Sequence, residues 1–70
     1  MKLACGIDIG GSGVKGALVD LTTGTYSGES VLIKTPSPAT PDAVAQVCGQ
    51  VLETLGVTPE IPVGITFPAP

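Results

Sequence analysis

A proline-rich stretch divides the chain into two parts with different patterns. Residues 35–41 read TPSPATP. Proline fixes its own φ angle and donates no backbone hydrogen bond, so this stretch suits neither a paired strand nor the interior of a helix. Before it, short apolar runs alternate with glycine-containing turns, whereas after it apolar residues recur at helical spacing. The stretch is therefore predicted to be a stiff connector between a group of strands and a helix.

Three strands are predicted before the connector and one after the helix. Gly28 and Glu29 indicate that the front half of the third strand is exposed or bulged, which favours an edge strand. The last strand is stopped by Pro68. Each segment is short and rich in apolar or β-branched residues. The four predicted strands are residues 3–9, 14–21, 26–34 and 63–67.

The helix carries start and stop signals. Thr40 suits the N-cap, Pro41 the first helical position, where no amide partner is needed, and Asp42 complements the positive end of the helix dipole. Gly56 suits the left-handed residue that follows a helix. The predicted order is β-β-β-α-β, an α/β fold in which the helix crosses over a mixed sheet and the last strand returns parallel. One side of the predicted helix is apolar, and this stripe consists of Val44, Val47, Cys48, Val51, Leu52 and Leu55.

The pattern also predicts an incomplete domain. Residues 3–9 and 63–67 are interpreted as strands that are apolar on both faces, but the chain supplies a single predicted helix to cover the sheet. One face is then left uncovered, and exposed apolar sheet is unfavourable in water. We therefore expect residues 1–70 to be part of a larger domain whose missing layer comes from residues beyond 70 or from a partner chain.

Composition excludes several classes of function. The chain has no histidine, which removes Ser-His-Asp hydrolysis, Cys-His proteolysis and histidine-ligated zinc. The formal net charge of -3 gives no basic field for nucleic acid or an anionic membrane. Cys5 and Cys48 are predicted to be small buried hydrophobes, as in a reducing compartment. Asp8 interrupts the N-terminal apolar run that a secretory signal would need, so the cytoplasm is the expected location.

The residues with the clearest chemistry lie in one turn. Residues 8–16 read DIGGSGVKG, and three of the four residues 10–13 are glycine, which lets backbone amides converge on an anion such as phosphate. A serine hydroxyl and a lysine charge add donors, and a carboxylate at the strand end suits a hydrated Mg²⁺. The candidate phosphate-binding residues are Asp8, Gly10, Gly11, Ser12, Gly13 and Lys15, with Asp8 also the candidate for the metal.

Two nucleotide-binding motifs and a hairpin without a ligand are the other interpretations of this turn. Gly11, Gly13 and Gly16 match the dinucleotide pattern G-x-G-x-x-G, but that pattern requires the glycines to open a helix, and here a strand is predicted to follow. A Walker P-loop needs adjacent glycine and lysine, which the chain lacks. A glycine-rich hairpin without any ligand remains an alternative. The aspartate before the turn and the lysine after it favour phosphate binding.

Residues 6–20, read GIDIGGSGVKGALVD, resemble the first phosphate motif of the sugar kinase, heat-shock and actin superfamily, and specifically that of the ROK kinases. The wider ROK pattern is D-x-G-G-T-K, whereas here Gly13 takes the lysine position and Lys15 follows two residues later. Strand alternation returns that lysine to the same face. The arrangement is similar to the polyphosphate glucokinases, as are the connector and the run VGITFP at residues 63–68. Ala69 departs from the family, which has glycine in this sugar-side loop.

The resemblance implies a fold, an activity and partners. The chain would be about the first quarter of a family member, the start of an actin-like, ribonuclease H-like ATPase domain. The longer protein would be a cytoplasmic homodimer that transfers phosphate from polyphosphate, and from ATP, to the 6-hydroxyl of glucose with Mg²⁺. Asp8 would lie near the metal, and residues 10–13 with Lys15 would cradle the phosphates. The catalytic aspartate would lie beyond Pro70, so the chain alone is expected to be inactive.

A free-standing small binding module, which would have to fold alone as 70 residues, is one alternative, and two further alternatives lie within the ROK family. One is a ROK sugar kinase that uses ATP alone. The other is a ROK-type sugar-sensing repressor without catalysis, which would carry a DNA-binding segment before the first strand, whereas here Lys2 leads directly into that strand.

Overall fold

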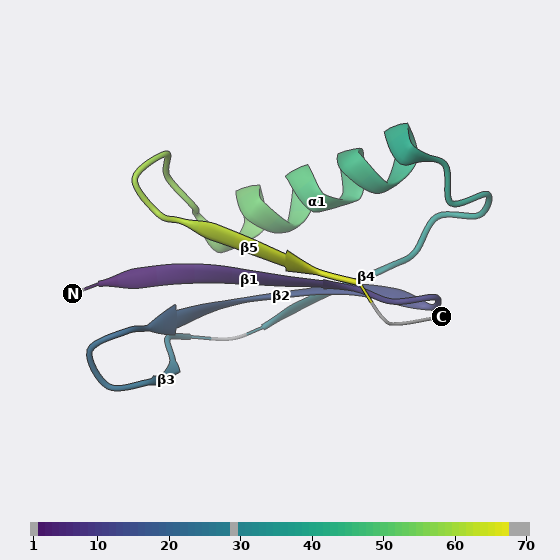
Figure 1. The fold of residues 1–70 in the computed structure, drawn as a ribbon. Coiled ribbons are helices and arrows are strands. Elements are labelled where there is room, and N and C mark those ends of the chain that lie inside the picture. The colour runs from purple at the N-terminus through teal and green to yellow at the C-terminus, as the bar shows by residue number, and fades with distance from the viewer. Residues whose placement is uncertain (1, 29, 68–70) are drawn as a thin grey trace.

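A computed structural model of the chain describes residues 2–28 and 30–67 and shows a five-stranded sheet with a helix on one side (Figure 1). The predictions made on Glu29, Pro68, Ala69 and Pro70 lie outside the described residues. The elements are β1 (Leu3–Ile9), β2 (Gly13–Asp20), β3 (Thr25–Tyr26), β4 (Val31–Lys34), α1 (Pro41–Leu55) and β5 (Val63–Thr66).

The sheet is mixed, as predicted. β1 lies inside the sheet, antiparallel to β2 on one side and parallel to β5 on the other. β3 and β4 both pair antiparallel with β2, β3 near its end and β4 near its start. β4 therefore runs parallel to β1 and β5. α1 is the crossover that connects β4, next to β2, with β5, next to β1. The predicted parallel return of the last strand is confirmed.

The third predicted strand is divided in two. Residues 26–34 were expected to form one strand with a bulged front half, but β3 ends at Tyr26 and β4 begins at Val31. Gly28 between them has a φ of 85°, a left-handed conformation that interrupts extended backbone. Gly28 therefore divides the predicted strand into two, where a bulge within one strand was expected. Both pieces lie along the outer edge of β2, as an edge strand should.

The helix begins and ends where its signals predicted. The Thr40 hydroxyl accepts a hydrogen bond from the Ala43 amide at 3.2 Å, which satisfies one of the free donors of the first turn. At the other end Gly56 has a φ of 71°. Its amide donates to the Glu53 carbonyl at 3.1 Å, and the Val57 amide donates to the Leu52 carbonyl at 3.0 Å. This pair of bonds is a Schellman motif. No helix in the described part of the chain is long and apolar enough to cross a membrane.

The core lies between α1 and one face of the sheet. Two residues of β1, one of β2 and two of α1 are buried together, with partly buried side chains around them. The helix approaches the sheet closely at Gly16, where an added Cβ would overlap Val51 Cγ1 and lie 3.3 Å from Leu55 Cδ1. Gly16 thus serves packing and not a dinucleotide fingerprint. The buried core residues are Cys5, Ile7, Val14, Val47 and Val51.

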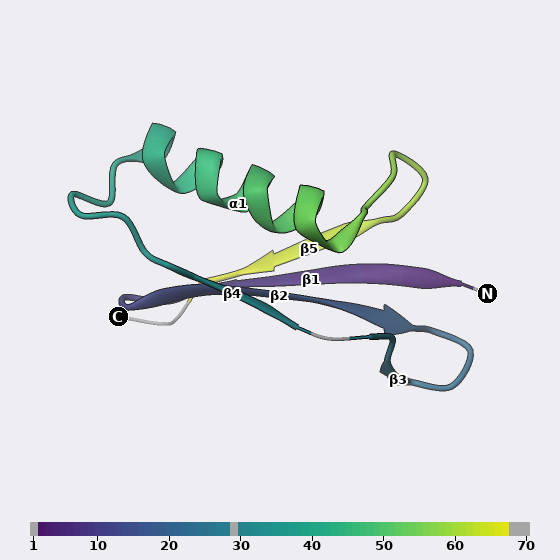
Figure 2. The same cartoon turned by 180° about the vertical axis from the view of Figure 1, so that it is seen from behind.

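The prediction that β1 and β5 are apolar on both faces is wrong. The apolar residues of β5 lie on the same face as α1, because Ile65 pairs in register with the buried Ile7. Ile65 and Phe67 remain 49% and 71% exposed, since the helix packs over β2 and β4 instead. The opposite face carries small and polar residues of the same two strands. Within the described residues, no segment covers that face, as Figure 2 shows from behind.

Gly16→Ala is expected to destabilise the protein by about 1–3 kcal/mol, because the new methyl group would overlap a fully buried side chain. Gly49→Ala is the matched control. It adds the same methyl group inside α1, where an added Cβ has no neighbour within 4 Å. There alanine should stabilise the helix by about 0.8–1 kcal/mol. Urea unfolding of both variants measures the difference, and equal effects would contradict the close packing of α1 on Gly16.

Cys5 is expected to resist alkylation in the folded protein. Its side chain is buried, and this desolvation raises the pKa of the Cys5 thiol, so at pH 8 less of it is the reactive thiolate. Cys48 is half-buried. Iodoacetamide at pH 8 should therefore modify Cys5 about tenfold or more slowly than Cys48, with similar rates for both in denaturant. Mass spectrometry of the digested protein gives both rates, and faster labelling of Cys5 would contradict this core.

Candidate functional site

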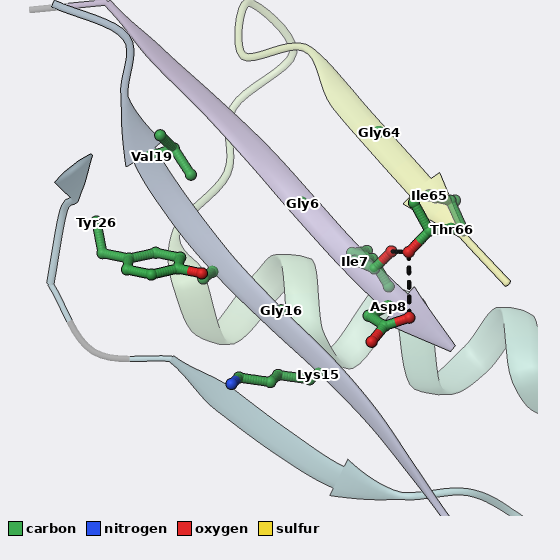
Figure 3. Close-up of a pocket in the computed structure, with 11 residues that line it drawn as sticks. Gly6, Ile7, Asp8, Lys15, Gly16, Val19, Tyr26, Gly64, Ile65 and Thr66 are labelled. Carbon is green, nitrogen blue, oxygen red and sulfur yellow. Dashed lines mark hydrogen bonds between the residues drawn. The ribbon is translucent and has the colours of Figure 1, made fainter. Parts of the chain in front are cut away.

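A row of side chains crosses three strands on the face opposite to α1. Asp8 of β1 pairs in register with Lys15 of β2 on one side and with Thr66 of β5 on the other. Residues that are partners in neighbouring strands point to the same face of a sheet. Figure 3 shows all three side chains on this open face. The aspartate and the lysine of the predicted site are therefore brought together, although seven positions separate them in the sequence.

Asp8 is oriented by Thr66. The Thr66 hydroxyl lies 3.1 Å from Asp8 Oδ1 and 3.5 Å from the Ile7 carbonyl oxygen (Figure 3). Because one hydroxyl has one proton to donate, the shorter and charge-assisted bond to the carboxylate is the stronger of the two. A carboxylate has room for several donors, so this bond leaves Asp8 able to accept others. Its side chain is exposed and accessible from the open face.

Lys15 contributes a positive charge to the same face. Its side chain is exposed, and in Figure 3 the amine extends away from the Asp8 carboxylate. In Figure 3 the amine lies toward the β4 side of β2 and not in contact with its register partner. Lys34 pairs in register with Gly13, so it lies on this face as well. Two of the three basic residues of the chain thus flank the start of β2.

A shallow depression of about 480 Å³ lies beside this row. Its floor is formed by the next register row, in which Gly6 pairs with Ala17 and with Gly64, so almost no side chain fills it. Asp8, Lys15 and Thr66 form one wall of the depression. Val19 and Tyr26 form the other (Figure 3).

The glycine turn lies at the end of β1, next to Asp8. The Gly10 amide donates to the Gly13 carbonyl oxygen at 2.9 Å and closes the turn. Gly10 is thus not a free donor for a phosphate, which corrects its predicted role. Within the part of the chain that the structure describes, the amides of Gly11 and Ser12 donate to no protein acceptor. Those two amides fit the predicted role better.

None of the three turn glycines has a positive φ angle, and two of them, Gly10 and Gly13, lie close to other atoms. Among the described residues only Gly24, Gly28 and Gly56 have positive φ. A Cβ at Gly10 would lie 3.2 Å from the Gly13 carbonyl oxygen, and a Cβ at Gly13 would lie 2.9 Å from Leu32 Cδ1. At Gly11 an added Cβ meets nothing within 4 Å. The backbone there is open to a ligand from outside the chain.

The predicted site residues are therefore neighbours but do not all line one hollow. Asp8 and Lys15 line the depression on the open face. Gly10 and Gly11 line a separate apolar hollow beside α1. Ser12 is exposed in the turn between them, and Gly13 begins β2. The turn thus lies where β1 ends and β2 begins, between the two faces of the sheet.

Sequence reasoning missed three residues. Thr66 could have been found from alternation, because Val63, Ile65 and Phe67 occupy the other face. Lys34 could have been found in the same way, although its pairing with Gly13 depends on the β2–β4 register. The Thr35 hydroxyl donates to the Gly10 carbonyl oxygen at 2.8 Å. No sequence pattern predicts this contact, because 25 residues separate the two.

Comparisons with known proteins identify relatives of this chain. The polyphosphate glucokinase of Mycobacterium tuberculosis is 48% identical to it over 63 residues, which are 90% of this chain and 23% of the relative. The Mycobacterium leprae polyphosphate glucokinase is also 48% identical over 63 residues, 19% of its length. No family model matches the chain.

A solved structure shows the same fold. The crystal structure of the inorganic polyphosphate/ATP-glucomannokinase of Arthrobacter sp. strain KM matches with a TM-score of 0.84 and 44% identity, over 99% of this chain and 29% of that one. The mixed sheet with its crossover helix is thus that of a kinase, consistent with the start of an actin-like ATPase domain. The resemblance to polyphosphate glucokinases is confirmed: the chain is similar to them over nearly its whole length, and it spans less than a third of theirs.

Proposed function

We propose that this chain forms the donor-phosphate side of a glucokinase that transfers phosphate from inorganic polyphosphate, and from ATP, to the 6-hydroxyl of glucose. In this proposal residues 1–70 are the N-terminal part of a ROK-type kinase, and the remainder of the kinase lies outside them. The observation that carries it is the placement of Asp8 and Lys15 side by side, next to a glycine turn with open amides, in a chain 48% identical to polyphosphate glucokinases.

The turn and the lysines would hold the donor phosphates. The Gly11 and Ser12 amides are donors without a protein acceptor among the described residues, and the Ser12 side chain is exposed beside them. Lys15 and Lys34 add positive charge on the adjoining face. Phosphoryl transfer relies on positioning and charge neutralisation more than on covalent chemistry. A short cradle of amides with two ammonium groups can supply both on the donor side.

Asp8 fits a hydrated Mg²⁺. Magnesium usually keeps several waters and is bound through one or two carboxylates together with substrate phosphates. Asp8 offers one exposed carboxylate held by Thr66, and among the described residues no group of three or more metal-binding side chains gathers. A single carboxylate suits this partly hydrated mode and not a cage made of protein alone. When bound, the ion would neutralise charge on the donor phosphates.

The group that removes the proton from the sugar hydroxyl is placed outside this chain. Asp20 accepts a hydrogen bond from the Thr22 amide at 2.8 Å and so shapes the turn after β2. Asp42 lies in the first turn of α1, where it complements the helix dipole. Both carboxylates therefore have structural roles away from Asp8. We propose that a catalytic aspartate and the glucose pocket belong to the rest of the kinase.

Location and assembly follow from the same proposal. Both cysteines of the chain are free, which supports the reducing cytoplasm, where ATP is also present. We propose a homodimer for the longer protein. The acidic net charge of this chain requires that most of the basic track for a long polyphosphate lie in the remainder.

The natural polypeptide that contains this chain is expected to form glucose 6-phosphate from glucose with polyphosphate and with ATP. The isolated 70-residue chain is the negative control, because the proposed base and sugar pocket lie outside it. A coupled glucose-6-phosphate dehydrogenase assay with each donor measures both reactions. Transfer from ATP alone would establish the ATP-only sugar kinase instead. No transfer from either donor, together with sugar-dependent DNA binding, would favour the repressor.

Asp8→Asn in the natural polypeptide is expected to lower kcat/KM about 10- to 100-fold, because the amide keeps the shape but loses the charge that orients the hydrated metal. Lys15→Met should raise the donor KM by a similar factor, since it removes a charge-assisted contact. Lys2→Met is the control, a lysine about 20 Å along β1 from Asp8. Steady-state kinetics compare the three. Equal kinetics for Lys15→Met and Lys2→Met would place the donor elsewhere.

A further inference from the structure

We infer that Thr35 is a positioning residue that sets the direction of the amides in the glycine turn. The inference rests on the proposed donor-phosphate role of that turn. Thr35 follows the last residue of β4 and is the first residue of the proline-rich connector. It is partly buried and has two contacts with the turn, one through its side chain and one through its backbone.

Both contacts are made to carbonyl oxygens of the turn. The Thr35 hydroxyl donates to the Gly10 carbonyl oxygen at 2.8 Å, and the Thr35 amide donates to the Ser12 carbonyl oxygen at 3.2 Å. One residue therefore holds two peptide groups, 10–11 and 12–13, that alternate along the turn. The connector helps to fix it, because a residue that precedes proline is restricted to extended conformations, and Pro36 comes next.

Holding a carbonyl also directs the neighbouring amide. A peptide group is planar and trans, so the N–H of one residue points opposite to the C=O of the residue before it. The bond to the Gly10 carbonyl turns the Gly11 N–H away from the Thr35 hydroxyl. The bond to the Ser12 carbonyl turns the Gly13 N–H away from the Thr35 amide. Thr35 thus presents the Gly11 amide outward from the turn. The Gly13 amide faces the end of β1 like the Gly13 carbonyl, and the Gly10 amide is used to close the turn.

The hydroxyl is the part of Thr35 that can be tested separately. Thr35→Val keeps the size and the backbone amide but removes the bond to the Gly10 carbonyl, and Thr35→Ser restores a hydroxyl. Thr54→Val is a matched control, because the Thr54 hydroxyl also donates to a backbone carbonyl, that of Gln50, at 2.8 Å, but it does so on the exposed side of α1. All three are made in the natural polypeptide.

Steady-state kinetics with polyphosphate and glucose form the first arm. Loss of one neutral hydrogen bond corresponds to about a three- to tenfold effect. Thr35→Val is therefore expected to raise the donor KM by this factor and leave the glucose KM unchanged. Thr35→Ser should return the donor KM to within about twofold of the original, and Thr54→Val should leave it unchanged. An unchanged donor KM in Thr35→Val, an equal rise in both KM values, or no rescue by serine overturns the inference.

Amide signals form the second arm and do not depend on turnover. Hydrogen exchange of the Gly10 amide should be faster in Thr35→Val than in Thr54→Val. Titration with inorganic tripolyphosphate should shift the Gly11 amide signal, with about three- to tenfold weaker binding in Thr35→Val. If these hold but glucose is not phosphorylated, the proposed function fails and the inference stands. If glucose is phosphorylated but Thr35→Val behaves as the original protein in both arms, the inference fails and the function stands.

Discussion

The register of the β1–β2 hairpin is the constraint on which this structure depends. Asp8 opposite Lys15 and Ile7 opposite Gly16 follow from one alignment of two strands. Because side chains alternate between faces, a slip of one residue would move every side chain of one strand to the other face. Cys5 and Ile7 would leave the core, and Asp8 would turn toward α1. The same alignment therefore buries the apolar residues and gathers the charged ones, so stability and the candidate site cannot be separated.

Local signals in the sequence predicted most of the elements. The helix was placed to the residue because Thr40, Pro41 and Gly56 act within one turn of their own positions. β1 was also placed to the residue, since it is an almost entirely apolar run between Lys2 and the glycine turn. The third strand was drawn too long because composition alone does not show that Gly28 adopts a left-handed angle. The residues around Gly28 have a high β propensity, but the left-handed backbone of this one glycine divides the strand in two.

The site was predicted in part for the same physical reason. Asp8 and Lys15 could be found because both flank one short turn, and alternation places them on one face. Thr66 and Thr35 were missed because their partners are 58 and 25 residues away, and such contacts depend on the order of the strands. The exposure of β5 could not be predicted either, since it follows from the helix covering β2 and β4 more than β5. What the sequence lacked was the position of each strand in the sheet.

The row formed by Gly6, Ala17 and Gly64 has a consequence for whatever meets the open face. Within a sheet the N–H and C=O groups are used between strands, so a surface with almost no side chains offers mainly Cα hydrogens, one methyl group and flat peptide groups. Such a surface has few protruding atoms and carries no charged group. An added Cβ at Gly6 or Gly64 would touch no atom of this chain within 4 Å. Fit at this place would be decided by the curvature of the main chain, while chemical selectivity would come from the polar wall beside it.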